Sequence, residues 1–553
     1  MPILEFKDFC FSYPDKEHNT LENINFTVNG GELVVMYGPT GSGKSTLLKQ
    51  IKKQIRPFGK KSGEVLYYGE NIDEISDLKS VCEIGFVFQN PENQIVADTV
   101  LHELAFSLEN IGLKTDEMRK RIGEMACFFG LENILDKSVH ELSGGQKQIL
   151  NLCSVLLLQP KILILDEPVS QLDPINAREF LKIIIQIIND FDITVILSEH
   201  RLDDIYFLAD KIIFLENGKI KHFGNPNMTA VSIKTDKNAN PDSMNFLPEL
   251  TKLYFSAEND FNIKNNKIPK NIREYKNWLT KFEVKYNFEN IKKNTENDIL
   301  IKCKDIYFSY AKDKPDILKG LRIQSEAGEI LSLMGGNGAG KTTLLKIMAG
   351  ILKPQRGKVL FSVKSKTEKT GNIGYLSQNP KAYFRYDTVE KEIFERVKDS
   401  EKSENIIKKE YAEYLIDLFK IKNILKLHPY DISGGEQQLT AFLTVMLTNP
   451  KILLLDEPTK GLDPNLKKSF FDLLYNFKNE GKTIIIATHD IEFAAKYSDS
   501  CCFLFDGEII SKSPPNKFFS ENYFYTTALN KLFRDAGNNN AVRIEDVILT
   551  EKI

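Results

Sequence analysis

Two glycine-rich octapeptides decide the fold: Gly38-Pro39-Thr40-Gly41-Ser42-Gly43-Lys44-Ser45 and Gly335-Gly336-Asn337-Gly338-Ala339-Gly340-Lys341-Thr342. Each follows a short apolar run that reads as a strand, residues 33–37 and 330–334, and each leads into a helix that begins near the lysine. A strand, a phosphate-binding loop and a helix make one unit of an α/β fold. The backbone N–H groups of such a loop hold polyphosphate, the lysine bridges the terminal phosphates, and the next hydroxyl binds Mg²⁺.

The octapeptides belong to a larger internal repeat. Their lysines are 297 residues apart, and two further motifs recur at an offset of 290, a Ser-Gly-Gly pentapeptide and an Asp-Glu pair. One octapeptide could be a glycine-rich turn, but two copies in register with other motifs exclude that alternative. One domain has therefore been duplicated with its motif order kept.

The Asp-Glu pairs end apolar strands, at Asp166-Glu167 and Asp456-Glu457. Ligands of parallel sheets bind where the strands end, so we expect the pairs beside the phosphates. The aspartate suits Mg²⁺ and the glutamate suits an attacking water, so we assign Glu167 and Glu457 as catalytic bases. An aspartate that caps a turn before proline is the alternative, and it explains one copy better than two.

The Ser-Gly-Gly pentapeptides each precede an apolar helix. They are Leu142-Ser143-Gly144-Gly145-Gln146 and Ile432-Ser433-Gly434-Gly435-Glu436. The serine could be a simple N-cap of the helix. Two glycines, however, leave N–H groups bare at the helix start, which favours a second phosphate clamp.

The bulk composition is that of an ordinary globular protein with room for two cores. The 553 residues are 42% hydrophobic and 27% charged, and the net charge of −3 gives no electrostatic reason to expect nucleic acid. No run approaches the roughly 18 apolar residues of a membrane-spanning helix, and the start lacks the regions of a signal peptide. The seven cysteines lack metal-site spacing. We therefore expect a cytosolic protein with reduced thiols.

The repeat sets the expected domains. We predict a first nucleotide-binding domain over residues 1–227, an accessory tail and linker over 228–297, a second domain over 298–513 and a C-terminal accessory segment over 514–553. We expect helices near 272–279 in the linker and over 523–533 in the last segment. Apolar strands that alternate with helices predict a parallel sheet covered on both faces in each domain.

Together these motifs resemble the ATP-binding cassette (ABC) ATPase family, and the resemblance covers both halves. It implies an α/β fold of two tandem P-loop NTPase domains, each with a mostly parallel sheet core, an antiparallel β subdomain and a helical signature subdomain. It also implies ATP and Mg²⁺ as cofactors and ATP hydrolysis as the activity.

The resemblance assigns roles position by position. It matches Tyr13 and Tyr310 to the aromatic that stacks on adenine, although a strand-end tyrosine can instead pack in the core. It matches His200 and His489 to the histidine that contacts the γ-phosphate, although a lone strand-end histidine is usually structural. The implied catalytic residues are Glu167, Glu457, His200 and His489, and the implied Mg²⁺ ligands are Ser45, Gln89, Asp166, Thr342, Gln378 and Asp456. The implied ATP-binding residues are both octapeptides with Thr46 and Thr343, both tyrosines, the serines and glycines of both pentapeptides with Gln146 and Glu436, and the aspartates Asp173 and Asp463, which cross between domains.

In this family ATP lies between two domains, held by the loop of one and the Ser-Gly-Gly motif of the other. The resemblance therefore implies one site with Lys44, Glu167 and His200 opposite Ser433, and another with Lys341, Glu457 and His489 opposite Ser143. The chain can then form the ATP sandwich within itself.

The segments after the two glutamines resemble the energy-coupling factor branch of ABC importers. They begin at Gln89-Asn90-Pro91 and Gln378-Asn379-Pro380 and continue to Asp98-Thr99-Val100 and Asp387-Thr388-Val389. In that branch this region docks a transmembrane scaffold protein, which energises a small substrate-binding membrane subunit for a vitamin or a transition-metal ion. The resemblance thus implies a peripheral protein on the cytoplasmic face of the cell membrane, without a nucleic-acid partner.

A soluble tandem ABC ATPase that acts on ribosomes or nucleic acid is the alternative. Such proteins resemble each other in a long, charged helical linker. Here Pro241, Pro248 and Pro269 interrupt the linker, which is only weakly basic. This favours the importer.

The two pentapeptides differ at two positions, where the second half has Ile432 and Glu436 in place of Leu142 and Gln146, and only the change to Glu436 alters a charge. A carboxylate near phosphate weakens ATP binding unless it is paired or turned away. We therefore expect mild asymmetry, with the Lys44 site the weaker one.

Overall fold

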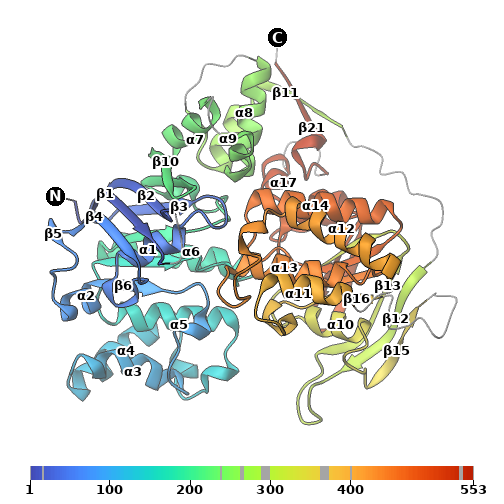
Figure 1. The fold of residues 1–553 in the computed structure, drawn as a ribbon, viewed down its shortest axis with the longest axis horizontal. Helices are drawn as coiled ribbons and strands as arrows, with labels where there is room; N and C mark the ends of the chain where they lie inside the picture. Colours follow the sequence, from blue (N-terminus) through green and yellow to red (C-terminus); the bar gives the residue numbers. More distant parts are fainter. Residues whose placement is uncertain are drawn as a thin grey trace. The chain divides into compact units, whose positions relative to one another are not determined.

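The computed structural model of the chain describes residues 2–14, 18–236, 240–261, 267–287, 299–361, 373–398, 402–534 and 540–551. The chain divides into two compact units, Met1–Asn271 and Ile272–Ile553. Each unit has its own central sheet (Figure 1). Within the described residues, no helix is both long and apolar enough to cross a membrane.

A six-stranded sheet in the order β10-β9-β3-β8-β7-β6 forms the centre of the first unit. Its strands are parallel except for the β9–β10 pair. The inner strands β3, β8 and β7 are buried along their whole length, as expected for a sheet with both faces covered. The bounds are β3 Leu33–Tyr37, β6 Ile84–Val87, β7 Ile162–Asp166, β8 Thr194–Ser198, β9 Lys211–Glu216 and β10 Lys219–Gly224.

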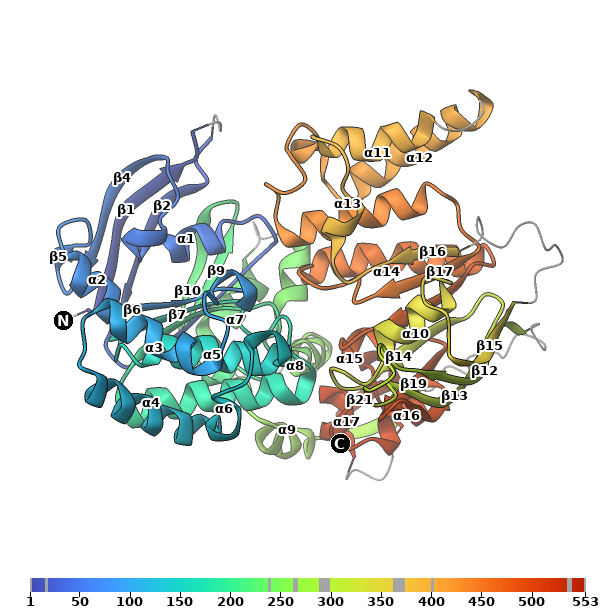
Figure 2. The ribbon, with the colours of Figure 1, turned by 90° about the horizontal axis from the view of Figure 1, so that it is seen from below.

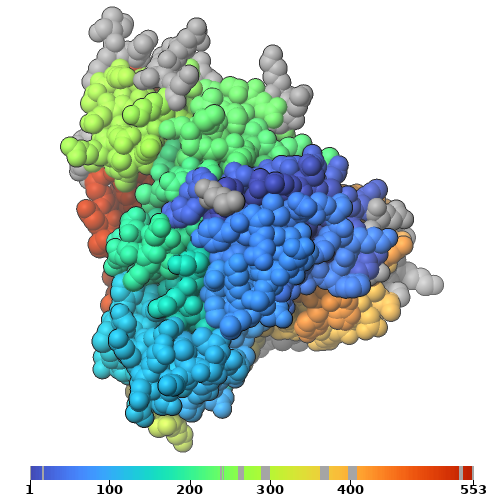
Figure 3. Space-filling view, turned by 90° about the vertical axis from the view of Figure 1, so that its left-hand side faces the viewer, coloured from blue at the N-terminus to red at the C-terminus, as the bar shows by residue number. Residues whose placement is uncertain are grey.

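Two subdomains flank this sheet. The antiparallel sheet β2-β1-β4-β5 shares one hydrophobic core with β3 and with α1, the helix after the glycine loop. Helices α3, α4 and α5 form a second core of their own, and Figure 3 shows the two subdomains side by side on one face, the β subdomain in dark blue and the helical one in cyan. The bounds are β1 Leu4–Ser12, β2 Leu21–Val28, β4 Lys60–Tyr67, β5 Glu70–Asn71, α1 Lys44–Gln50, α2 Asp77–Glu83, α3 Val100–Asn110, α4 Thr115–Phe129, α5 Gly144–Leu156 and α6 Pro174–Phe191.

The second unit repeats this plan with the strand order β16-β17-β18-β14-β19-β20 (Figure 2). Only the β19–β20 pair is antiparallel. A three-stranded antiparallel sheet, β13-β12-β15, and helices α11 to α13 correspond to the two subdomains. The bounds are β12 Ile299–Phe308, β13 Leu318–Glu326, β14 Ile330–Met334, β15 Arg356–Phe361, β16 Ile373–Leu376, β17 Ile452–Asp456, β18 Thr483–Ala487, β19 Ser500–Phe505, β20 Glu508–Ser513, α10 Lys341–Met348, α11 Val389–Lys398, α12 Lys402–Leu418, α13 Gly434–Met446, α14 Pro464–Asn479 and α15 Ile491–Tyr497. The fold class expected from the sequence is confirmed.

The segment between the repeats contributes to both units. Helices α7 (Pro226–Thr235) and α8 (Glu249–Phe261) pack on the first unit, where Lys234 pairs with Glu258 at 2.7 Å. Helix α9 (Ile272–Leu279) and strand β11 (Phe282–Tyr286) belong to the second unit, and β11 pairs with β21 (Val547–Glu551). Residues 237–239, 262–266 and 288–297 of this segment lie outside the described residues.

The C-terminal segment packs on the central sheet of the second unit. Helix α16 (Pro515–Glu521) places Phe518 and Phe519 in one cluster with Met334 of β14. The helix expected over residues 523–533 is shorter, because α17 spans Ala528–Phe533. The hydroxyl of Thr527 accepts the N–H of Asn530 at 3.0 Å and so caps the helix there.

Candidate ATP-binding and hydrolysis sites

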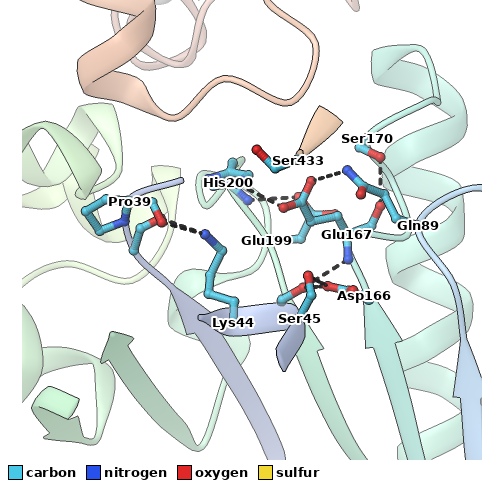
Figure 4. A network of polar contacts seen from close by, with 12 residues as sticks. Pro39, Lys44, Ser45, Gln89, Asp166, Glu167, Ser170, Glu199, His200 and Ser433 are labelled. Carbon is cyan, nitrogen blue, oxygen red and sulfur yellow. Dashed lines mark hydrogen bonds and ion pairs between the residues drawn. The ribbon is translucent and has the colours of Figure 1, made fainter. Parts of the chain in front are cut away.

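The first glycine loop wraps around its own lysine. The Nζ of Lys44 donates to the carbonyl oxygens of Gly38 at 2.9 Å and Pro39 at 3.0 Å (Figure 4). A Cβ at Gly38 would lie 1.9 Å from the carbonyl oxygen of Leu215 in β9. Glycine is therefore needed at this position to avoid a clash with the neighbouring strand, in addition to any need for space around a phosphate. A Cβ at Gly41 would meet nothing within 4 Å, which leaves the open cradle that phosphates need.

The second loop repeats these contacts and adds one. The Nζ of Lys341 donates to the carbonyls of Gly335 at 2.8 Å and Gly336 at 3.0 Å, and it also lies 3.2 Å from Nε2 of His489. A Cβ at Gly335 would lie 2.3 Å from the carbonyl oxygen of Leu504 in β19. The two loops therefore have the same architecture, and in both the first glycine packs against the backbone of a neighbouring strand.

Each loop brings one hydroxyl against one strand-end aspartate. The Oγ of Ser45 donates to Oδ1 of Asp166 at 3.1 Å, and the Oγ of Ser198 donates to the same oxygen at 2.7 Å. Burial, with the charge of Glu167, raises the pKa of Asp166. In the second unit burial raises the pKa of Asp456, and its interaction with Thr342 opposes that shift.

These pairs fit Mg²⁺ by their donor chemistry. The Oδ2 of Asp456 is buried and without a hydrogen-bond partner, so it is an oxygen that a cation can use. No cluster of three or more His, Cys, Asp or Glu residues suited to a metal occurs within the described ranges. Mg²⁺ takes one or two carboxylates from the protein and completes its shell with phosphates and water. When bound, Mg²⁺ neutralises charge that develops on the phosphates.

Glu167 lies between two side chains that the sequence placed in the site. Its Oε2 accepts the Nε2 hydrogen of Gln89 at 2.7 Å, and its Oε1 lies 2.9 Å from Nε2 of His200 (Figure 4). Its backbone is left-handed, with a φ of 46°, and its N–H donates to the carbonyl of Ser198 at 3.1 Å. Strained backbone of this kind is common at functional sites.

Glu457 has the same backbone, with a φ of 50°, but a different set of partners. Its Oε1 lies 3.2 Å from Nε2 of His489, and its Oε2 accepts the backbone N–H of His489 at 3.4 Å. Burial raises the pKa of Glu457 to about 7, although Lys341 opposes the shift. Gln378 is exposed, whereas its counterpart Gln89 contacts Glu167. The structure therefore joins glutamine, glutamate and histidine in the first unit, and lysine, glutamate and histidine in the second.

The expected adenine-stacking tyrosines lie beside the helix that follows each loop. The hydroxyl of Tyr13 is 3.1 Å from that of Thr46, and the hydroxyl of Tyr310 is 3.2 Å from that of Thr343. Tyr310 is 55% exposed and is therefore accessible to a base.

The two aspartates that the family resemblance placed at a domain crossing cap helices in their own units. Asp173 accepts the N–H groups of Ile175 and Asn176 at the start of α6, and Asp463 accepts those of Asn465 and Leu466 at the start of α14. Both aspartates are buried. Each one caps the helix at the end of the loop that begins at the proposed base of its unit, Glu167 or Glu457.

The Ser-Gly-Gly serines are N-caps, as the simpler alternative predicted. Ser143 and Gln146 form a capping box at the start of α5, and Ser433 and Glu436 form one at the start of α13. The two boxes differ in one bond, because the hydroxyl of Ser433 also donates to Oε2 of Glu436 at 2.7 Å. In the first box the Oγ of Ser143 only accepts a hydrogen bond, from the backbone N–H of Gln146 at 3.3 Å. The hydroxyl proton of Ser143 can therefore be donated to another acceptor. A Cβ at Gly144 or Gly434 would meet nothing within 4 Å, so both helix starts are open.

Sequence reasoning missed a pair of buried glutamates beside the loops that follow the glutamines. Glu103 in α3 accepts the N–H groups of Val96 at 2.9 Å and Ala97 at 2.8 Å. Glu392 in α11 accepts those of Arg385 and Tyr386. The two glutamates are 289 residues apart, which is also the spacing of Gln89 and Gln378, and this shared offset was the available signal.

The comparisons with known proteins agree with this geometry. The ABC transporter family matches residues 21–170 and 318–460. A protein of Bacillus anthracis is 44% identical over 96% of this chain and 95% of its own length, and one of Methanosarcina acetivorans is 30% identical over 94% and 87%. Both carry the provisional name ABC transporter ATP-binding protein.

Two solved structures are similar in part or in whole. CbiO1 from Clostridium perfringens, part of the ABC transporter complex cbiONQ, is 33% identical over 41% of this chain and 90% of its own, with a TM-score of 0.38. The archaeal ribosome recycling factor aABCE1, solved with the ribosomal stalk protein aP1, covers 93% of this chain and 92% of its own at 19% identity, with a TM-score of 0.58, and so shares the fold. With the family match in both halves and full-length relatives, the chain belongs to the ABC transporter family and is an ATPase with two ATP-binding domains.

Proposed function

We propose that this chain is the ATP-hydrolysing subunit of a membrane importer of the energy-coupling factor type. It works at the cytoplasmic face of the membrane with a transmembrane scaffold protein and a small substrate-binding subunit for a vitamin or a transition-metal ion. The names of its relatives support a transporter, and the segments after Gln89 and Gln378 support this branch.

One observation carries the proposal: exposed apolar side chains surround a loop whose backbone is fixed from inside. Val96 is 64% exposed and Phe106 is 46% exposed, while the buried carboxylate of Glu103 holds the backbone of the loop between them. Apolar side chains on a fixed loop are what a protein partner can bind with little ordering cost.

The second unit has a corresponding set. Tyr430 is 52% exposed, and its ring lies 6.2 Å from that of Phe384 and 5.5 Å from Nζ of Lys381. Glu392, completely buried, holds the neighbouring backbone. Each unit thus offers exposed apolar side chains on or near the segment that follows its glutamine, and two such surfaces suit a scaffold protein that docks on both.

We expect Val96→Asp to lower the amount of chain recovered with detergent-solubilised membranes at least about tenfold, because a charge at the centre of an apolar interface stays desolvated. The measurement is quantitative recovery of the tagged full-length chain from membranes, followed by identification of the proteins that co-purify. Phe58→Asp is the matched control, because Phe58 is 87% exposed and lies in the connection before β4, outside the segment after Gln89 and outside α3.

Recovery of small multi-spanning membrane proteins with the wild-type chain, lost in Val96→Asp and kept in Phe58→Asp, is the expected result. Equal recovery of membrane proteins with Val96→Asp and with Phe58→Asp would show that the surface around Val96 does not bind the membrane partner. Co-sedimentation of the chain with ribosomes, without membrane proteins, would support the alternative.

The alternative is a soluble tandem ATPase that acts on ribosomes. The shared fold with aABCE1, at 19% identity, shows the fold alone. The described part of the segment between the repeats contains short helices, α7, α8 and α9, whose longest has 13 residues. These short helices differ from the long, charged helical linker that ribosome-associated tandem ATPases share.

We also propose, from the family resemblance, that the chain forms its ATP sandwich internally, with Ser433 serving the Lys44 site and Ser143 the Lys341 site. Within the second unit the hydroxyl of Ser433 donates a hydrogen bond to the carboxylate of Glu436. This hydrogen bond must break before Ser433 can donate to a phosphate. Ser143 has no such competitor in its capping box. The Lys44 site is therefore the weaker one.

Glu436→Gln should raise the ATP affinity of the Lys44 site about threefold, because the amide keeps the cap of α13 and removes the negative charge. ATP affinity is measured in a Lys341→Ala background, which isolates that site. The reciprocal variant, Gln146→Glu in a Lys44→Ala background, should lower affinity by a similar factor. Equal affinities in all four proteins would contradict the asymmetry.

A further inference from the structure

A buried carboxyl group, that of Glu199, lies next to the proposed hydrolysis site of the first unit. Glu199 follows β8 directly and precedes His200, and its side chain is only 1% exposed (Figure 4). We propose that Glu199 is a positioning residue of the first unit, which directs the backbone of His200 away from Glu167 so that Gln89 can contact that glutamate.

The contacts of Glu199 join two segments of the site. Its Oε1 accepts the N–H of Val169 at 3.1 Å, and its Oε2 accepts the N–H of His200 at 3.1 Å. Val169 lies in the loop between Glu167 and the helix-capping Asp173. One side chain therefore fixes the distance between this loop and the histidine.

The second unit shows what happens at the same position without this carboxyl group. Thr488 stands there, and its single side-chain oxygen accepts the N–H of Asp490 at 3.0 Å. The N–H of His489 then points to the catalytic Glu457 itself, at 3.4 Å from Oε2. One carboxylate oxygen of Glu457 is thus used by the backbone next to it.

In the first unit the corresponding oxygen has a different partner. Because Glu199 takes the N–H of His200, Oε2 of Glu167 accepts Gln89 at 2.7 Å instead. Gln89 begins the loop that we assign to partner binding, so this contact connects that loop to the catalytic base. The unit with Glu199 has the contact, and the unit with Thr488 has an exposed glutamine, Gln378.

The groups that face Glu199 agree with a positioning role. Glu167 lies near enough to repel it, Arg201 attracts it, and the two N–H groups stabilise its charge. Burial and Glu167 together raise the pKa of Glu199 to about 7. Burying a carboxyl group beside another carboxylate costs free energy, so the hydrogen bonds of Glu199 are best explained by a role in the site.

The test replaces Glu199 with the residue of the second unit. In a Glu457→Gln background, where hydrolysis depends on Glu167, we expect Glu199→Thr to lower kcat about tenfold with less than a twofold change in KM for ATP. The split between kcat and KM is informative, because Glu199 contacts the residues around the base and has no assigned contact with ATP. A thermal melt checks that the first unit stays folded.

A double-mutant cycle makes the test specific. Gln89→Ala should lower kcat clearly in the Glu457→Gln background and have little additional effect once Glu199 is Thr, because its contact with Glu167 is already lost. The matched control pairs Gln378→Ala with Thr488→Val in a Glu167→Gln background, where the two effects should be additive. Additive effects of Gln89→Ala and Glu199→Thr, or a KM change as large as the kcat change, would overturn the proposal.

This inference rests on Glu167 as the catalytic base and is independent of the membrane partner. If Glu167→Gln in the Glu457→Gln background left hydrolysis unchanged, the assignment of the base would fail. If Glu167→Gln abolished hydrolysis while Glu199→Thr had no effect, only the positioning role would fail.

Discussion

The double variant Glu167→Gln, Glu457→Gln should hydrolyse ATP at least about 100-fold more slowly than the wild-type chain. A glutamine has nearly the shape of a glutamate, and its amide oxygen can still accept the side chain of Gln89. It cannot take a proton from water at neutral pH, so the variant removes the base without removing the site.

Each single variant should lose the hydrolysis of its own site. We expect ATP affinity to stay within about threefold of wild type in all three proteins, because neither glutamate holds the nucleotide in this assignment. Phosphate release under saturating ATP is the measurement, with Glu22→Gln as the control, since Glu22 forms an ion pair with Lys219 on the surface of the first unit. Hydrolysis by the double variant at the wild-type rate would show that another group is the base.

Gly38→Ala should destabilise the first unit by at least about 3 kcal/mol and abolish ATP binding at the Lys44 site. The new Cβ would lie 1.9 Å from the carbonyl oxygen of Leu215, a contact that real Cβ atoms do not make. The oxygen cannot move away easily, because β9 is paired with β3 on one side and with β10 on the other. The loop must therefore move, and Lys44 moves with it.

Gly335→Ala should have the same effect on the second unit, where the distance to the carbonyl oxygen of Leu504 is 2.3 Å. The matched controls are Gly112→Ala and Gly481→Ala, with φ values of 75° and 85° and open space around the new Cβ. Their free energy of unfolding should fall by only about 1–2 kcal/mol, the cost of a left-handed backbone at a residue with a Cβ. Thermal unfolding and ATP titration separate the two outcomes, and equal losses in all four variants would show that strain alone explains the glycine at position 38.

The sequence predicted the ATP-binding framework well because backbone geometry and phosphate chemistry demand particular residues at particular places. Only glycine fits the turn against β9, and only an apolar run makes a strand such as β7 that ends at Asp166. Both requirements leave local patterns, and their duplication removed the ambiguity of a single match.

The parts that the sequence could not predict depend on contacts between distant segments. Glu103 and Glu392 look like surface glutamates of amphipathic helices until the fold brings loop N–H groups against them. Glu199 lies next to a predicted site residue, yet its partner Val169 is 30 residues earlier in the chain. The tail helix is shorter than its apolar pattern suggested because one threonine caps it, a bond that competes locally with helix extension.

The division of the segment between the repeats was also hidden. A single polar stretch gave no sign that α9 and β11 belong to the second unit, since β11 pairs with β21, more than 260 residues away. Pairing at such sequence distance follows from the complete fold and leaves no local pattern.

Phosphate release by the purified full-length chain, measured in the presence of solubilised membranes and in the presence of ribosomes, tests the account most directly. We predict hydrolysis that depends on Mg²⁺, rises when the membrane fraction is added, is unaffected by ribosomes and is absent in the Glu167→Gln, Glu457→Gln variant. Hydrolysis that rises with ribosomes and not with membranes, or that persists in the double variant, would contradict it.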